Sequence, residues 1–190
     1  MNKPQGELLF WTKYLSERGL ISGSEGNLSI RFKDGFFITP SGKVKETLSL
    51  RDLSYITLKG ECLSGCPSSE WGLHYKIYLK NPQAKAVVHT HPLYGLALER
   101  LGFNFREFQH FEAKLILREL AILPPIPAGS PKLWEFASNL CRGNRIVILS
   151  QHGLLAWGES LEEAVNYTLI LEKLCHLEYL IRISLTKGGR

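Results

Sequence analysis

The chain has 190 residues, of which 44% are hydrophobic and 22% are charged, so it can bury one core but is too short for two comfortable domains. Its formal net charge of +5 comes without a basic stripe interleaved with aromatic residues, so we expect no nucleic-acid partner, and a small anionic substrate fits the charge equally well. No window approaches the roughly 18 uninterrupted apolar residues of a membrane span, and no secretory signal opens the chain. We therefore expect a single cytoplasmic domain over residues 1–190, with no membrane partner and with its four cysteines as thiols.

The first part of the chain predicts a helix, a β-rich segment and a second helix. An apolar stripe that ends at a glycine predicts the first helix, over residues 6–19. Short runs rich in β-branched and aromatic residues predict strands at 27–31, 35–40 and 53–58. Residues 68–80 predict the second helix, because two serines open it and an Asn-Pro pair follows it.

The second part predicts strands between helices. The expected strands are 85–90, 145–150 and 153–158, with the last two forming a hairpin. The expected helices are 93–101, 134–141 and a long one from Ser160, whose buried stripe is Ala164, Tyr167, Leu171, Leu174 and Ile181. Residues 102–131 are rich in proline and predict strand and loop. The interleaving favours one α/β domain in which neighbouring strands are mostly antiparallel.

Two histidines end the apolar run KAVVHTHP. Side chains alternate between the faces of a strand, so His89 and His91 project to the same side, where both can bind one ion. Two ordinary half-buried histidines are the competing interpretation. His152, in the predicted turn of the hairpin, is the candidate third ligand, and three protein ligands would leave open positions for water or substrate, as in a catalytic zinc site.

A candidate base and candidate anion ligands lie near the start of the second predicted helix. Glu70 follows Ser68 and Ser69, and in a first helical turn the helix dipole favours an ionised carboxylate and a bound anion. An ordinary helix cap accounts for the same residues.

Two small-residue loops, 24–27 and 39–43, also suggest anion binding, because glycine lets backbone amides approach an oxyanion closely. Routine turns remain the alternative for both loops. Lys43 is either the counter-charge of the anion or a solvated surface lysine.

Five motifs in this order, GLISGSEGNLSIR, ITPSGK, SSEW, AVVHTHP and SQHGLLAWG, resemble the class II aldolase/adducin family over nearly the whole chain, most closely its L-fuculose-1-phosphate aldolase branch. The resemblance implies that His89, His91 and His152 bind one zinc ion and that Glu70 is the catalytic acid/base. It also implies phosphate-binding residues, which are Gly26, Asn27, Ser41, Gly42, Ser68 and Ser69. The implied fold is a three-layer α/β/α domain around a largely antiparallel sheet, assembled as a homotetramer with active sites between subunits.

The implied reaction is aldol cleavage of a ketose 1-phosphate to dihydroxyacetone phosphate and a small aldehyde, through a metal-stabilised enediolate. One departure concerns the aldehyde side, where Phe111 stands in place of an expected tyrosine, with His110 and Glu112 as possible substitutes. A ribulose-5-phosphate 4-epimerase, a methylthioribulose-1-phosphate dehydratase, a non-catalytic adducin-like domain and a zinc-dependent sensor remain alternatives. Manganese or cobalt remains an alternative to zinc.

Overall fold

A computed structural model describes residues 4–116 and 120–187 of the chain, and in this part the strands form one eight-stranded sheet in the order β4-β3-β2-β1-β5-β8-β7-β6. The strands are β1 (Asn27–Phe32), β2 (Gly35–Ile38), β3 (Ser54–Thr57), β4 (Cys62–Ser64), β5 (Ala86–Thr90), β6 (Leu120–Leu123), β7 (Ile146–Leu149) and β8 (Gly153–Gly158). Neighbouring strands pair antiparallel except β6 and β7, which are parallel. The prediction of a largely antiparallel sheet is confirmed, and so are the six predicted strands.

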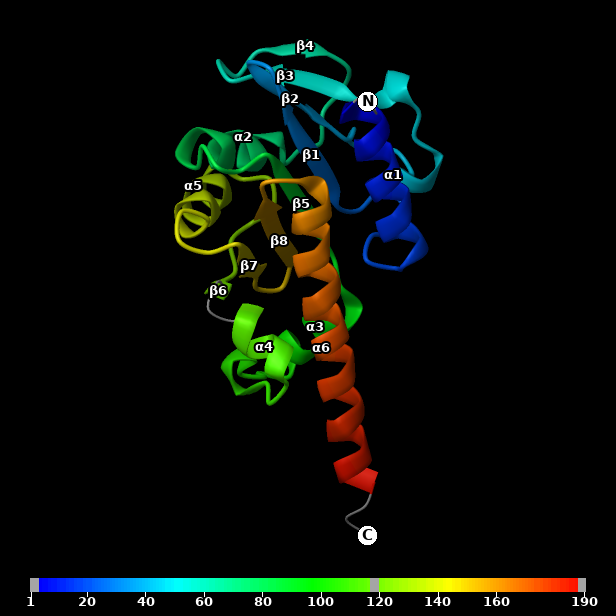
Figure 1. The fold of residues 1–190 in the computed structure, drawn as a ribbon, viewed down its shortest axis with the longest axis vertical. Helices are drawn as coiled ribbons and strands as arrows, with labels where there is room; N and C mark the ends of the chain where they lie inside the picture. Colours follow the sequence, from blue (N-terminus) through cyan, green and yellow to red (C-terminus); the bar gives the residue numbers. More distant parts are fainter. Residues whose placement is uncertain (1–3, 117–119, 188–190) are drawn as a thin grey trace.

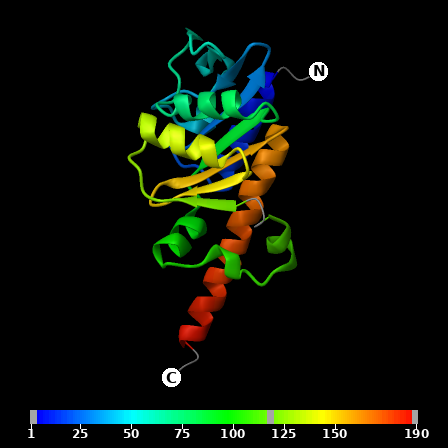
Figure 2. The ribbon, with the colours of Figure 1, turned by 90° about the vertical axis from the view of Figure 1, so that its left-hand side faces the viewer.

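Helices cover both faces of the sheet (Figure 1). They are α1 (Pro4–Glu17), α2 (Trp71–Lys80), α3 (Leu93–Arg100), α4 (Phe111–Ile116), α5 (Pro131–Leu140) and α6 (Leu161–Lys187), with short 3-10 turns η1 (Lys45–Thr47), η2 (Leu50–Asp52) and η3 (Phe105–Glu107). Figure 2 looks onto the layer formed by α2 and α5, and α1 and α6 lie behind the sheet. The expected three-layer α/β/α fold is therefore confirmed.

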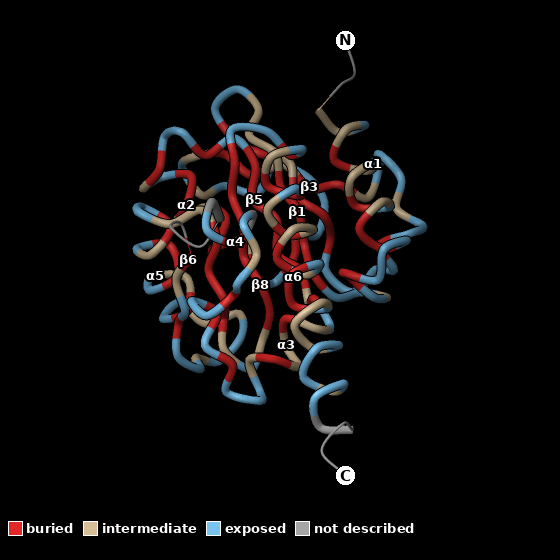
Figure 3. The backbone as a smooth tube through the Cα atoms, turned by 60° about the horizontal axis from the view of Figure 1, so that its bottom comes forward, coloured by how far each residue is buried: buried red, intermediate tan, exposed pale blue. Residues whose placement is uncertain are grey.

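The central strand β5 shows how the sequence produces these layers. Its five residues are all buried, and their side chains alternate between the two faces. Val87 packs in the core beneath α2 and α5, whereas Ala86 and Val88 pack in the core beneath α1 and α6. His89 shares the parity of Val87 and so projects to the α2 side. Figure 3 shows the buried strands surrounded by exposed loops and helix surfaces.

The predicted start of α2 was wrong, because the helix begins at Trp71 and not at Ser68. The Ser68 amide donates to the carbonyl oxygen of Thr39 at 3.1 Å, so this backbone pairs with the preceding loop instead of coiling. The turn that follows brings the Trp71 amide to the carbonyl oxygen of Ser68 at 3.0 Å. Glu70 consequently occupies the N-cap position, and its side chain is free to point away from the helix.

Two other expectations needed correction. Ile181 is 41% exposed instead of buried, because the last turns of α6 extend beyond the sheet (Figure 1). The 102–131 segment contains β6 and loops, as expected, but also η3 and α4. In this segment Phe103, Phe105 and Phe108 form an aromatic cluster that packs against α6. In the described part of the chain, no helix combines the length and the apolar character needed to cross a bilayer.

Candidate metal centre and active site

Three adjacent strands bring the candidate residues to one end of the sheet. Asn27, the first residue of β1, pairs with His89 of β5, and His89 pairs on its other side with Leu155 of β8. His152 lies immediately before β8, in a turn where Gln151 has a left-handed backbone with φ 61°. The sheet register therefore places residues from distant parts of the sequence around one point.

The three predicted histidines converge at that point. Each histidine offers one ring nitrogen as a ligand atom, and these three nitrogens all lie within 4.8 Å of one another. The Nε2 atoms of His89 and His91 are 3.1 Å apart. The Nδ1 atom of His89 donates to the carbonyl oxygen of Leu154 at 3.0 Å, which leaves the lone pair on Nε2, facing the cluster. Burial lowers the pKa of His89 to about 4, so its ring is neutral near pH 7, as metal binding requires.

A glycine makes room for the cluster. A Cβ atom at Gly153 would lie 2.7 Å from Cδ2 of His91 and 2.9 Å from Cε1 of His89. It would also lie 2.5 Å from the backbone oxygen of Thr90. Only glycine at this position lets β8 start so close to both rings.

The Glu70 carboxylate faces the histidines. Its Oε2 atom lies 3.2 Å from Nε2 of His89, and its Oε1 atom lies 3.5 Å from Nε2 of His152. Burial raises the pKa of Glu70, but the attraction of His89 and His152 and a hydrogen bond from Asn27 outweigh burial, so the pKa lies below its ordinary value. Oε1 is buried and accepts no hydrogen bond within the described residues, which leaves it free to act on a ligand.

A chain of buried polar groups holds Glu70 in place. The Asn27 amide donates to Oε2 of Glu70 at 3.1 Å, and His74 Nε2 donates to Oδ1 of Asn27 at 2.5 Å. Ser29 donates to Nδ1 of His74 at 2.7 Å, and Tyr78 donates to Ser29 at 2.7 Å. Burial lowers the pKa of His74 to about 3, so the ring stays neutral and keeps this direction of donation.

His74 is not among the site residues that the sequence predicts, so sequence reasoning missed this link. A signal was available, because His74 stands four residues after Glu70 and so faces the same side of α2 one turn later. Asn27, predicted to bind phosphate, uses its side chain for Glu70 and His74.

The predicted residues line one cavity of about 470 Å³. Those that line it are Gly26, Asn27, Ser41, Gly42, Ser68, Ser69, Glu70, His91 and His152. His89 lies behind them and is fully buried. The 39–43 loop meets the 66–69 segment through an antiparallel bridge between Pro40 and Pro67, which places Thr39 beside Ser68 and Ser41 beside Cys66.

The cavity also contains residues that the sequence did not reveal, among them Lys45 and Gly129. Lys43, the candidate counter-charge, instead forms an exposed ion pair with Asp52. Lys45 is the buried lysine of this region, with 2% of its surface exposed.

Neither Phe111 nor His110 is among the described residues that line this cavity. Phe111 is 74% exposed on α4, and His110 borders a separate hollow against α6. The side chain of Glu112 lies outside the described residues.

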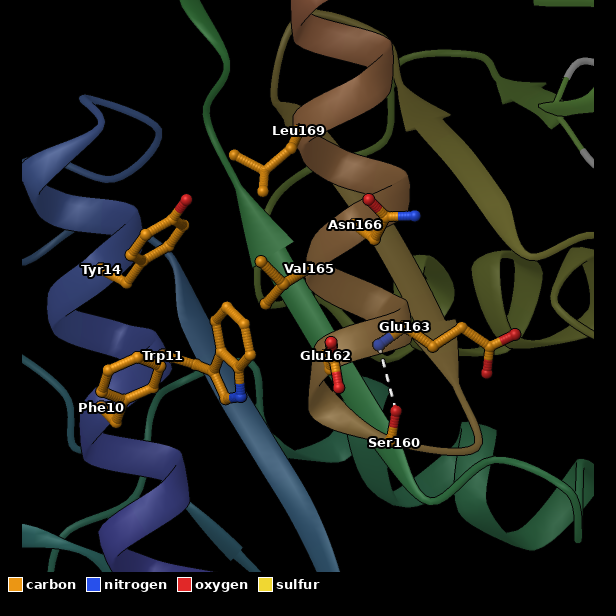
Figure 4. A pocket seen from close by; sticks show the side chains of 9 residues that line it. All are labelled: Phe10, Trp11, Tyr14, Ser160, Glu162, Glu163, Val165, Asn166 and Leu169. Atoms are coloured by element: carbon orange, nitrogen blue, oxygen red, sulfur yellow. Dashed lines mark hydrogen bonds between the residues drawn. The ribbon is translucent and has the colours of Figure 1, made fainter. Parts of the chain in front are cut away.

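A larger groove of about 560 Å³ lies between α1 and the start of α6 (Figure 4). Phe10, Trp11 and Tyr14 form its α1 side, and Ser160 at its far end accepts a hydrogen bond from the amide of Glu163, which caps α6. No histidine is among its described lining residues. Ser160 and Glu163 thus stabilise the start of α6, and the predicted site residues lie in the smaller cavity.

Three convergent imidazoles beside a buried carboxylate, in an open cavity, are the arrangement of a metal-dependent enzyme site. Residues 7–179 match the model of the Class II Aldolase and Adducin N-terminal domain. The chain belongs to this family, and it is an enzyme of the class II aldolase superfamily.

Similar proteins include named enzymes. An L-fuculose phosphate aldolase of Methanococcus maripaludis is 34% identical over 167 residues, which cover 88% of this chain and 91% of that protein. A 3-oxo-tetronate 4-phosphate decarboxylase of Haemophilus influenzae is also 34% identical, over 87% of this chain and 82% of its own length. The crystal structure of L-fuculose-1-phosphate aldolase from Thermus thermophilus superposes with a TM-score of 0.81 at 29% identity, covering 100% of each chain.

Proposed function

We propose that this protein is a zinc-dependent aldolase that cleaves a ketose 1-phosphate similar to L-fuculose 1-phosphate into dihydroxyacetone phosphate and a small aldehyde. The observation that carries the proposal is the convergence of three imidazoles on a buried, hydrogen-bonded carboxylate at the wall of a cavity. The similarity to aldolases that act on sugar phosphates supports the substrate class.

The residues present fit a zinc ion. The hydrogen bond from His89 to Leu154 fixes the ring so that its free nitrogen faces those of His91 and His152, the donor set of an open catalytic site. Zinc held there supplies Lewis-acid stabilisation of the negative charge that develops on the substrate as the carbon–carbon bond breaks.

Glu70 carries the proton chemistry in this proposal. Asn27 orients one carboxylate oxygen, and the other is free to remove a proton from C3 of dihydroxyacetone phosphate; the carboxyl group so formed returns that proton to C3. Ser41, Ser68 and Ser69 supply hydroxyl donors for the substrate phosphate, and Gly26 and Gly42 let the loop backbone approach it.

The assembly and setting of the enzyme are also proposed. We infer a single domain over residues 1–190, a cytoplasmic location and a homotetramer with active sites between subunits. In this assembly Phe111, which is exposed on α4, would lie at the cavity of a neighbouring subunit.

Decarboxylation of a 3-oxo acid phosphate is the second candidate, because a decarboxylase is as similar in sequence as the aldolases are. Both reactions leave negative charge next to a carbonyl group, and the same three histidines would serve both. An epimerase, a dehydratase and a non-catalytic adducin-like domain are less favoured.

The test incubates the zinc-loaded protein with a panel of ketose 1-phosphates and couples the products to a dihydroxyacetone phosphate assay. A 3-oxo-tetronate 4-phosphate is assayed in parallel for release of carbon dioxide. Activity only in the second assay overturns the aldolase assignment. Silence in both assays, with zinc still tightly bound, favours the other members of the superfamily.

A variant pair tests the role of Glu70. Glu70→Gln should retain zinc but lose proton exchange at C3 of dihydroxyacetone phosphate by a factor of about 10² or more. Glu61→Gln, at an exposed position, is the matched control and should exchange at the normal rate. Undiminished exchange in Glu70→Gln removes Glu70 from the mechanism.

A further inference from the structure

Lys45, the first residue of η1, is a buried lysine at the edge of the candidate site. Its Nζ atom donates to the carbonyl oxygens of Ser24 at 3.0 Å, Pro40 at 3.0 Å and Lys43 at 3.2 Å. Three acceptors match the three hydrogens of an ammonium group. The side chain is therefore held in one position, and its donors are fully used.

Among the residues that the structure describes, the charge of Lys45 has no anionic partner. No carboxylate of the described residues makes an ion pair with Nζ, and burial alone lowers the pKa of Lys45 from its ordinary value. Burying a charge is costly unless an opposite charge compensates it. Lys43, two residues away, offers the contrast, because its side chain is 57% exposed and pairs with Asp52. The uncompensated charge belongs to Lys45 and lies at the cavity wall.

Lys45 also joins the two glycine loops of the cavity. One acceptor, Ser24, precedes Gly26, and the acceptors Pro40 and Lys43 flank Gly42. The Lys45 amide makes a further contact with the first loop, donating to the carbonyl oxygen of Gly23 at 2.9 Å. The loops that shape the Ser41 side of the cavity thus meet at this one side chain.

We propose that Lys45 is the fixed positive charge of the phosphate end of the cavity, a positioning residue that holds the two loops together and attracts a phosphate group without hydrogen bonding to it. The bound phosphate supplies the anion that the buried ammonium lacks. The inference rests on the proposed function only in taking the ligand to be a phosphorylated compound.

The test measures the affinity of inorganic phosphate by calorimetry on the zinc-loaded full chain, which requires no turnover. Lys45→Met should weaken phosphate binding about tenfold or more, since one unit charge is removed from the wall of the cavity. Lys43→Met, the same chemical change at the exposed lysine, should stay within about twofold of the wild type. Lys45→Arg should retain most of the affinity, because it keeps the charge.

Zinc affinity separates an electrostatic role from a general collapse of the site. In Lys45→Met the affinity for zinc should fall much less than the affinity for phosphate, because the hydrogen bonds that the Lys45 ammonium makes to described residues go to backbone oxygens and not to the three histidines. Wild-type phosphate affinity in a folded Lys45→Met protein overturns the proposal. Equal losses of zinc and phosphate, with no recovery in Lys45→Arg, also overturn it and assign Lys45 to folding alone.

A second measurement covers the case in which Lys45→Met does not fold. Burial lowers the pKa of Lys45, so the wild type should lose phosphate affinity at a pH below the ordinary lysine range of about 10, whereas Lys45→Arg should show a flatter profile because arginine keeps its proton. Identical profiles for the two proteins contradict the proposal. If phosphate binding behaves as expected but the aldolase assays are silent, only the proposed function fails.

Discussion

Replacing His74 by phenylalanine tests whether the buried polar chain behind Glu70 holds the carboxylate in position. The ring of His74 has no exposed surface, and the variant keeps a ring while removing both hydrogen bonds. Asn27 Oδ1 is then buried without its donor, which costs about 1–3 kcal/mol, and the lost bond to Ser29 adds about 1 kcal/mol. The expected loss of about 3 kcal/mol corresponds to a fall in Tm of roughly 6–12 °C for a domain of this size.

The assay is urea and thermal unfolding of the zinc-loaded protein, together with proton exchange at C3 of dihydroxyacetone phosphate. Tyr78→Phe is the matched control, because it removes only the outermost hydroxyl and leaves the contacts of His74 and Asn27 intact. It should cost about 1 kcal/mol and leave the exchange rate close to normal. His74→Phe should slow exchange about tenfold or more, since Glu70 loses its orientation. Equal losses of stability and of exchange in the two variants would refute the orienting role.

Three further predictions concern the pH dependence of stability, the affinity for zinc and the steric room at Gly153. Lowering the pH from about 7.5 to about 5 should destabilise the protein by roughly 2 kcal/mol through His74. The cause is that His74 gains a proton in the unfolded chain but stays neutral in the folded protein, where its pKa is lowered. In urea titrations, His74→Phe should lack this contribution to the pH dependence of stability. Glu25→Gln should weaken zinc binding about tenfold in a competition assay, because the Glu25 carboxylate lies 3.4 Å from Nδ1 of His91, and an unchanged zinc affinity would contradict this. Gly153→Ala should lose zinc while the far-ultraviolet spectrum stays native, because its Cβ displaces two rings; normal zinc content would refute the clash.

Local patterns predicted much of the fold and the cluster of three histidines. The alternation of side chains along a strand placed His89 and His91 together, and the predicted hairpin turn offered His152 as the third. The pairing of β5 with β8, which brings His152 to the other two, is seen in the structure. The helix start at residue 71 did not follow from composition. It depends on the pairing of Ser68 with Thr39, which is a contact between loops.

The hydrogen-bonded chain behind Glu70 also could not be predicted from local sequence patterns, because it depends on contacts between distant segments. His74 reads as a packing residue until β1 brings Asn27 and Ser29 against α2. The sequence likewise presents Lys43 and Lys45 as two lysines of one loop. The turn after Pro40 leaves the Lys43 side chain in solvent and buries the Lys45 side chain at the wall of the cavity. This difference in burial arises from tertiary structure.

The central place of β5 has a consequence for folding kinetics. Asn27, His89 and His152 meet only after β5 has paired with β1 on one side and with β8 on the other, and both pairings join distant parts of the chain. Such contacts form late, because the loops between them must close first. An ion bound by the histidines would therefore do little to speed folding but would slow the opening of the sheet. Metal loading would lengthen the lifetime of the folded protein while leaving its rate of formation unchanged.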